Sequence, residues 1–163
     1  MSVDRKKKIL EGVRAELRRE MGVIERAAKD AWEGATHEEN KPEHNKDMRA
    51  TEASYVAMGQ SARLRELTEA LAKIDALSLG AWPANTPASV GALVTIEGED
   101  EQENAQRLVV LIVPAGGGVT VEDGGDRVRA VTPQAPLGEA LMGTSVGDPV
   151  KVLRRAYEVL SIE

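Results

Sequence analysis

The sequence lacks cysteine and phenylalanine, and only 2% of its residues are aromatic. Without cysteine, disulfide bonds, thiolate catalysis and cysteine-ligated zinc sites are excluded. Two tryptophans and two tyrosines are too few to build the stacking surface that binds single-stranded nucleic acids. Positive charge is also scarce, because 27 acidic residues outnumber 21 basic ones. The resulting net charge of −6 argues against a surface that wraps duplex nucleic acid.

Long hydrophobic runs are absent as well. The clearest apolar run, residues 108–115, is far shorter than the roughly 20 residues that cross a bilayer. No membrane contact is therefore expected. The basic residues that follow Met1 have no apolar stretch behind them, so they do not resemble a secretory signal. These absences predict a cytoplasmic protein of 163 residues, enough for one domain or two small ones.

Glycine and proline divide the chain into two parts. Residues 1–78 hold 4 of the 15 glycines and 1 of the 7 prolines, and their 15 basic and 15 acidic residues balance. The later residues hold the other 11 glycines and 6 prolines, with 6 basic and 12 acidic residues. Residues 79–89 contain one glycine and two prolines, which is the composition of a linker. We therefore predict a first part at 1–78, a linker at 79–89 and a second part at 90–163.

The first part has the apolar spacing of a helical coiled coil. Residues 3–33 and 48–77 are each predicted to form a helix of roughly 45 Å. Between them the apolar period is lost, and Pro42 lacks the N–H that a continuing helix needs. We therefore predict an antiparallel hairpin with its tip at residues 34–47, and a single helix through Pro42 is the alternative. The predicted seam residues are Leu10, Val13, Leu17, Ile24, Ala27 and Ala31, then Leu64, Leu67, Leu71 and Ile74.

Charge is concentrated at two places in this first part. Residues 6–8 are three lysines, which we expect to form the solvated start of the first helix. Residues 34–47 contain four carboxylates that repel one another unless a cation or a positive pocket receives them, and hard divalent ions are common recipients. A solvated loop that keeps the hairpin soluble is the other interpretation. The charged tip residues are Glu38, Glu39, Glu43 and Asp47, and the two histidines His37 and His44 lie among them.

The second part has the pattern of strands. Branched apolar residues and polar–apolar alternation predict strands at 90–96, 106–113, 127–131, 150–153 and 156–162. Pro136 and Gly143 mark the first turn and the end of one short helix. Residues 116–118 and 122–126 are expected to be turns, the first of them within a hairpin. The predicted fold class is α+β, with an N-terminal antiparallel coiled-coil hairpin followed by a small antiparallel sheet.

Residues 135–150 resemble a known signature. The stretch Ala-Pro-Leu-Gly-Glu-Ala-Leu-Met-Gly at 135–143, followed by Gly-Asp-Pro-Val at 147–150, is similar to the carboxyl-terminal signature of the bacterial Gre (GreA/GreB) transcript cleavage factors. The order of parts is similar too, since that family has a coiled-coil hairpin, a linker and a sheet domain of FKBP-like fold. Glu39 and Asn40 also match the Glu-Asn pair of the family's hairpin tip. The chain is identified as a divergent member of the Gre family by this resemblance.

The resemblance implies a transcription elongation factor that binds RNA polymerase. In the Gre family the sheet domain docks on the polymerase, and the hairpin enters the secondary channel, where tip carboxylates assist cleavage of backtracked RNA. The chain would be a monomeric accessory factor and not an enzyme, reaching the nascent RNA 3′ end indirectly. It would hold no cofactor of its own and share the magnesium of the polymerase active site. The resemblance assigns docking to Gln134, Pro136 and Leu137, and the carboxylate role first to Glu39, with Glu38, Glu43 and Asp47 as further candidates.

Two positions depart from the family pattern. Thr36 stands where the family tip has an aspartate, three residues before Glu39, and Ala135 stands where the family has the serine of a Ser-Pro turn. Because of Thr36, two functions stay open. Either another tip carboxylate replaces the missing one, or the protein occupies the channel and regulates or inhibits the polymerase without cleavage. A coiled-coil adaptor that dimerises through Leu64, Leu67 and Leu71 is a third class.

Overall fold

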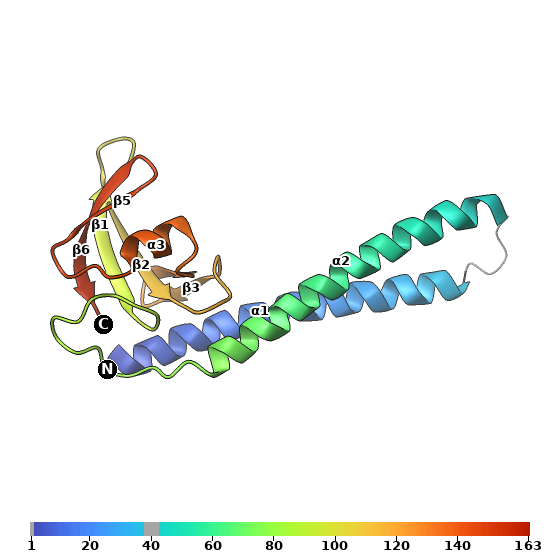
Figure 1. Ribbon diagram of the computed structural model, residues 1–163, viewed down its shortest axis with the longest axis horizontal. Coiled ribbons are helices and arrows are strands. Elements are labelled where there is room, and N and C mark those ends of the chain that lie inside the picture. The colour runs from blue at the N-terminus through green and yellow to red at the C-terminus, as the bar shows by residue number, and fades with distance from the viewer. Residues whose placement is uncertain (1, 38–42) are drawn as a thin grey trace. The chain divides into compact units, whose positions relative to one another are not determined.

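The computed structural model describes the backbone of residues 2–37 and 43–163, and the side chains of residues 2–31, 33 and 57–163. Two long helices come first, α1 at Ser2–His37 and α2 at Glu43–Asp75 (Figure 1). A six-stranded sheet with one short helix follows, so the α+β class is confirmed. The strands are β1 Leu93–Glu99, β2 Ala105–Ile112, β3 Thr120–Asp123, β4 Asp126–Val131, β5 Pro149–Val152 and β6 Arg155–Ile162, and the short helix is α3 Pro136–Leu141.

The contacts within the chain define two compact units. The first unit combines Met1–Glu16 with Ala70–Glu163, so it contains the start of α1, the end of α2 and the whole sheet. The second unit, Leu17–Glu69, consists of the remaining parts of the two helices. The start of α1 therefore belongs with the sheet, although more than 70 residues separate them in the sequence.

Both long helices run further toward the predicted tip than their apolar pattern indicated. The first was expected to end near residue 33 and extends to His37, and the second was expected to begin near residue 48 and begins at Glu43. Loss of an apolar period removes a packing face, but it does not remove the helical preference of residues such as alanine, glutamate and lysine. Residues 38–42, with Pro42 among them, lie outside the described residues.

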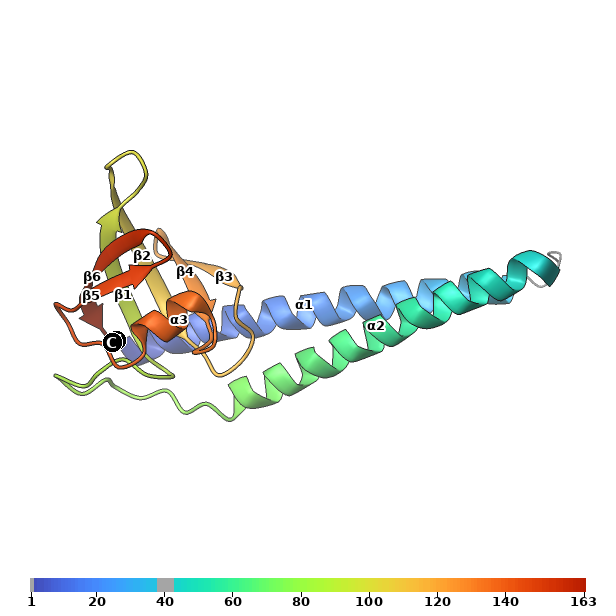
Figure 2. The same ribbon diagram turned by 45° about the horizontal axis from the view of Figure 1, so that its top comes forward.

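In the second unit, α1 and α2 lie side by side in both views (Figures 1 and 2). The Arg63 guanidinium joins them by an ion pair, with its Nη2 2.7 Å from Glu20 Oε1. Leu17 and Leu67 are buried as predicted, but Ala27 and Ala31 are exposed, so their assignment to the seam was wrong. A methyl group removes little apolar area from water, and alanines at seam spacing therefore provide little force for close packing.

The sheet is mixed, which corrects the prediction of an antiparallel sheet. The strand order is β3-β4-β2-β1-β6-β5, and β2 pairs with β4 in parallel while the other pairs are antiparallel. The parallel pair arises because the chain passes through residues 113–119 and the edge strand β3 before it enters β4. Sequence reasoning missed β3 because it is four residues long and lies between two glycine-rich segments. Residues 116–118 therefore lie in a crossover and not in a hairpin turn.

Both faces of the sheet are covered. One face is covered by α3 (Figure 2). The apolar core on this face includes Val94, Ile96, Val110 and Leu141. Because side chains alternate along a strand, the neighbouring residues Leu93, Thr95, Val109, Leu111, Val128 and Ala130 point to the other face, where they are buried as well. The start of α1 lies against this second face. A Cβ added to Gly12 would lie 2.6 Å from Cγ1 of Val121, so glycine permits close approach of α1 to β3.

Lys6 is fully buried, which corrects the expectation of a solvated helix start for this residue, while Lys7 and Lys8 are exposed as expected. Its ammonium donates hydrogen bonds to the carbonyl oxygens of Gly80 at 2.7 Å and Gly91 at 3.3 Å. The same ammonium lies 5.3 Å from the centre of the Trp82 ring, within range of a cation–π interaction. Burial lowers the pKa of Lys6, against the opposing effect of the Glu163 carboxylate. The segment between α2 and β1 is thus fixed to the first helix by one cation.

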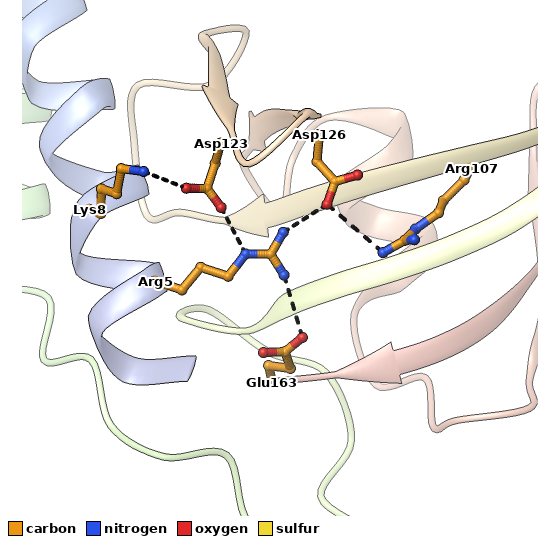
Figure 3. A network of polar contacts seen from close by, with 6 residues as sticks. All are labelled: Arg5, Lys8, Arg107, Asp123, Asp126 and Glu163. Carbon is orange, nitrogen blue, oxygen red and sulfur yellow. Dashed lines mark hydrogen bonds and ion pairs between the residues drawn. The ribbon is translucent and has the colours of Figure 1, made fainter. Parts of the chain in front are cut away.

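Arg5 and Lys8 join the first turns of α1 to the edge of the sheet (Figure 3). Arg5 donates from Nε to Asp123 Oδ2 and from Nη2 to Asp126 Oδ2, both at 2.9 Å, and its Nη1 lies 3.7 Å from Glu163 Oε1. Lys8 donates to the second oxygen of Asp123 at 2.9 Å. These hydrogen bonds, with that from Arg5 the stronger cause, lower the pKa of Asp123. Two carboxylates that the sequence assigned only to a turn therefore hold α1 on the sheet.

The adjacent lysines 6 and 7 give a matched test of this burial. We expect Lys6→Met to lower the free energy of unfolding by about 1–3 kcal/mol, because the carbonyls of Gly80 and Gly91 lose their donor while staying covered. Lys7→Met, at an exposed position of the same helix, should change it by less than about 0.5 kcal/mol. Urea denaturation measures both variants, and equal effects would show that Lys6 is not buried in solution.

The Asp123 network predicts a pH-dependent stability difference. At pH 7 Asp123→Asn should lower the free energy of unfolding by about 1–3 kcal/mol, because Arg5 and Lys8 lose their charged acceptor. The folded-state pKa of Asp123 is depressed, so its contribution is present above the unfolded value near 4 and is lost as the pH falls through the folded value. The difference between wild type and variant should therefore shrink below about pH 4.

The control for this experiment is Glu122→Gln. Glu122 is exposed and pairs with the exposed Arg127, an arrangement that contributes at most about 1 kcal/mol. Denaturation curves at several pH values between 7 and 3 compare the two substitutions. A stability loss in Asp123→Asn that does not change with pH would contradict the charge-based role of Asp123.

Candidate functional site

The predicted carboxylate site at the hairpin tip lies outside the described side chains. Glu38 and Glu39 fall within residues 38–42, and for Glu43 and Asp47 the structure gives only their place in α2. For Thr36 and His37 it gives only their place in α1, and for His44 only its place in α2. The role of these residues therefore stays a prediction. Among the residues whose side chains are described, no three acidic or histidine side chains are grouped so that they could hold a metal ion.

The predicted docking residues Gln134, Pro136 and Leu137 lie together at the start of α3. Pro136 is the first residue of this helix, where its fixed φ fits and its missing N–H costs no hydrogen bond. Gln134 and Pro136 are exposed, while Leu137 is half-buried and packs against the core beneath α3. The turn thus presents a polar and an apolar side chain on a backbone that the core holds in place.

The glycines of the signature are required by the geometry of this region. A Cβ on Gly138 would lie 1.9 Å from the carbonyl oxygen of Thr132, so no other residue allows α3 to lie so close to the preceding chain. Gly143 and Gly147 have φ values of 79° and 90°, which other residues rarely adopt. Gly143 also donates a backbone hydrogen bond to Ala88 at 2.8 Å, which ties the end of α3 to the segment before β1.

The aspartate of the signature also has a structural partner. The Asp148 side chain accepts a hydrogen bond from the backbone N–H of Ser145 at 2.8 Å, and its backbone carbonyl accepts one from Val159 at 3.0 Å. These bonds fix the turn that leads into β5. The motif Gly-Asp-Pro-Val therefore shapes the fold next to α3, and its Pro149 begins β5, where it pairs with Glu158 of β6.

An open groove of about 480 Å³ lies beside the docking turn. Ala135, Pro136 and Leu137 form one part of its lining, and the end of β5 with Leu153 forms another. A second hollow, of about 430 Å³, has Arg129 and Leu137 in its lining as well, so the two share a border. The remaining residues around the groove are Gly117, Gly118, Arg129, Ala130, Val131, Thr132 and Val152.

Sequence reasoning did not single out Leu153 or Arg129 as surface features. Leu153 was expected to be the last residue of a strand, but β5 ends at Val152 and Leu153 lies in the turn to β6, where it is 91% exposed. Arg129 was expected only as an outward residue of a strand. The available signal was the position of Leu153 between two alternating runs, which is typical of a hairpin loop.

The fold is that of an α+β protein with two long N-terminal helices and a mixed sheet. None of its described helices, at residues 2–37, 43–75 and 136–141, combines the length and the apolar character needed to span a membrane. No family model matches the sequence, and no curated protein does.

Three solved structures are similar to this chain over nearly its whole length. The crystal structure of GreA factor homolog 1 (Gfh1) of Thermus thermophilus is 18% identical and has a TM-score of 0.38, over 99% of this chain and 94% of that one. A structure described as the transcription factor Gfh1 is 19% identical, with a TM-score of 0.38 and coverage of 98% and 92%. Thermus aquaticus Gfh1 is 16% identical, with a TM-score of 0.37 and coverage of 93% and 94%.

The start of α3 generates a stability prediction. Ala135 is the N-cap residue and has extended backbone angles, φ −73° and ψ 149°, but its side chain makes no capping hydrogen bond. Ala135→Ser should raise the free energy of unfolding by about 0.5–1 kcal/mol, because the hydroxyl can accept a bond from a free N–H of the first turn. Ala140→Ser within the same helix has no such donor and should not stabilise. Thermal melting checks both, and equal melting temperatures for Ala135→Ser and wild type would contradict the prediction.

Proposed function

We propose that this chain is a Gre-like transcription factor that binds RNA polymerase at its secondary channel. The observation that supports the proposal is the 135–150 signature, whose residues form α3 and the entry to β5 in a sheet that follows two long helices. In this assignment the two helices are the coiled-coil hairpin and the sheet is the FKBP-like docking domain. The protein acts as an accessory factor, and the chemistry takes place in the polymerase.

Docking is assigned to the turn at the start of α3. Its exposed residues Gln134 and Pro136 stand next to an apolar groove, and the core that holds Leu137 keeps the turn rigid. A rigid surface loses little conformational entropy when a partner binds. The missing serine hydroxyl at Ala135 weakens the cap of α3 but removes none of these exposed groups.

The hairpin tip is assigned to the polymerase active site. Carboxylate oxygens are the ligands that magnesium prefers, so Glu39 and its acidic neighbours have the donor chemistry that a shared ion requires. Bound magnesium supplies Lewis-acid stabilisation of the oxygens in phosphodiester hydrolysis. The part of this chain is to bring charged oxygens to that place and to hold them there.

Thr36 supports a second candidate function. A threonine cannot supply the carboxylate that the family tip has three residues before Glu39. The tip of this chain therefore has one carboxylate ligand fewer at the family positions. A protein with an intact docking surface and fewer ligands would occupy the channel and exclude other factors without promoting cleavage. Such a factor regulates or inhibits the polymerase.

Competition for purified bacterial RNA polymerase tests the proposed function. The full chain should bind the polymerase with 1:1 stoichiometry, and a known cleavage factor of the Gre family should displace it. Monomeric protein in sedimentation would separate this function from that of a coiled-coil dimer. Binding that a Gre factor does not displace would overturn the assignment to the secondary channel.

Glu39 is the position at which the two functions give different results. On a backtracked complex, wild type should accelerate RNA shortening and Glu39→Gln should reduce the rate by at least about tenfold, equivalent to about 1.4 kcal/mol of barrier. Glu25→Gln, which removes an exposed carboxylate from the described part of α1, is the matched control and should keep the full rate. If wild type leaves the RNA uncut but blocks cleavage by another factor, the inhibitory function is the correct one.

A further inference from the structure

The second part of the chain carries little positive charge, and half of that charge is gathered in one place. Residues 79–163 contain six basic side chains against twelve acidic ones. Three of the six, Arg107, Arg127 and Arg129, line the hollow of about 430 Å³ over β2, β3 and β4, which we call the arginine hollow. Small-molecule sites commonly have volumes of roughly 300–1,000 Å³. The arginine hollow therefore has both the size and an unusual charge for a ligand site.

The register of the sheet shows which side chains share the face beneath the arginine hollow. Arg129 of β4 lies opposite Thr120 of β3 and beside Val110 of β2. Arg127 and Leu108 stand two residues earlier on β4 and β2, and side chains two apart along a strand point to the same face. All five residues line the hollow. Two guanidinium groups and a hydroxyl group thus stand beside apolar side chains on one face of the sheet.

The two arginines of β4 are available to a ligand. Arg129 is exposed and has no ion-pair partner among the residues whose side chains are described. Arg127 pairs with Glu122 at 2.9 Å, but the two side chains are 79% and 68% exposed. Such exposed ion pairs contribute little, so an anion that meets both arginines can replace this contact.

Of the described residues that line the arginine hollow, Asp126 alone is acidic. Its carboxylate accepts a hydrogen bond from Nη2 of Arg5 at 2.9 Å and lies 3.9 Å from Nη2 of Arg107 (Figure 3). These two guanidinium groups balance the charge of Asp126, and Arg107 is thereby engaged as well. The positive charge of Arg127 and Arg129 is therefore not cancelled by a carboxylate of the lining.

The spacing of the arginines indicates the charged part of the ligand. A guanidinium group matches the geometry of a phosphate with two parallel hydrogen bonds. Two residues along a strand advance by about 7 Å, so Arg127 and Arg129 can each meet one phosphate of a diphosphate.

The rest of the lining indicates the uncharged part. Leu108 and Val110 provide an apolar floor that the core beneath α3 holds in place. Gln106 adds an amide group, which can both donate and accept hydrogen bonds, next to this floor. A flat ring with polar edges fits an apolar floor beside an amide group. A phosphorylated ligand that carries a nucleobase has both parts.

We propose that the arginine hollow binds a nucleoside diphosphate. Arg127 and Arg129 bind the phosphates, and the Thr120 hydroxyl donates a further hydrogen bond to them. Leu108 contacts the base, and the amide of Gln106 bonds to its edge. This inference does not rest on the proposed function, because it concerns a ligand of the isolated chain.

Isothermal titration calorimetry of the full chain tests the ligand, with ADP, pyrophosphate and adenosine as probes. ADP should bind, and pyrophosphate and adenosine should each bind at least about tenfold more weakly, because each keeps one part of the contacts. Higher salt should weaken the binding of ADP and pyrophosphate but not that of adenosine, since ion pairs with exposed arginines are screened.

Substitutions test the residues with ADP as the probe. Arg129→Gln should weaken binding by at least about tenfold, because charge-assisted hydrogen bonds to a phosphate are lost. Arg129→Lys keeps the charge without the planar fork and should lose less. Arg154→Gln is the matched control, since Arg154 is an exposed arginine outside the arginine hollow and its loss changes the net charge equally. Its affinity for ADP should stay within about twofold of wild type.

Three outcomes would overturn the inference. ADP that does not bind removes the site, and equal losses in Arg129→Gln and Arg154→Gln would show a general attraction of anions by exposed arginines. Pyrophosphate that binds as tightly as ADP would show an anion site without a place for a base. None of these results bears on polymerase binding, which is measured separately. A chain that binds ADP as expected but does not bind the polymerase would sink the proposed function and leave the inference standing.

Discussion

The buried ammonium of Lys6 is the contact on which the first unit depends. It donates to carbonyl oxygens of Gly80 and Gly91, so one cation joins the start of α1 to both halves of the segment that leads into β1. A buried charge is tolerated only when it is hydrogen-bonded, and removing it would leave covered carbonyls without a donor. Arg5 adds charge-assisted hydrogen bonds to Asp123 and Asp126, at the turn between β3 and β4. The start of α1 is therefore an integral layer of the first unit.

The sequence allowed us to predict the features that each segment determines by itself. Alternation and branching located five strands, and Pro136 with Gly143 located α3, because these signals describe each segment's own backbone and faces. The burial of Lys6 could not be predicted in this way, since its acceptors are 74 and 85 residues away. A run of lysines is predicted to be solvated as long as the carbonyl acceptors at Gly80 and Gly91 are unknown. The parallel pairing of β2 with β4 was missed for a similar reason, because the short edge strand β3 between them in the sequence gives too weak a signal to be recognised.

The candidate site also contains residues that could be predicted from local sequence and residues that could not. The docking turn could be located from sequence because its motif contains residues with local geometric roles, such as Gly138 against Thr132 and Asp148 on the Ser145 N–H. Leu153 could not, because its significance lies in an exposure and a φ angle that only the folded hairpin gives. The tip carboxylates remain known from sequence alone.

Docking and cleavage place different demands on the chain. A docking surface needs apolar area and rigid backbone, and in the proposed function these come from residues that pack into the core of the first unit. A carboxylate that serves an active site in another protein needs charge and reach, and it contributes nothing to that core. Substitutions at the tip, such as threonine at position 36, can therefore change the activity of a docked factor without a cost in stability or affinity. In the proposed function, a cleavage factor and an inhibitor of the same polymerase differ by a few such tip residues. The surface by which both dock is constrained by the fold.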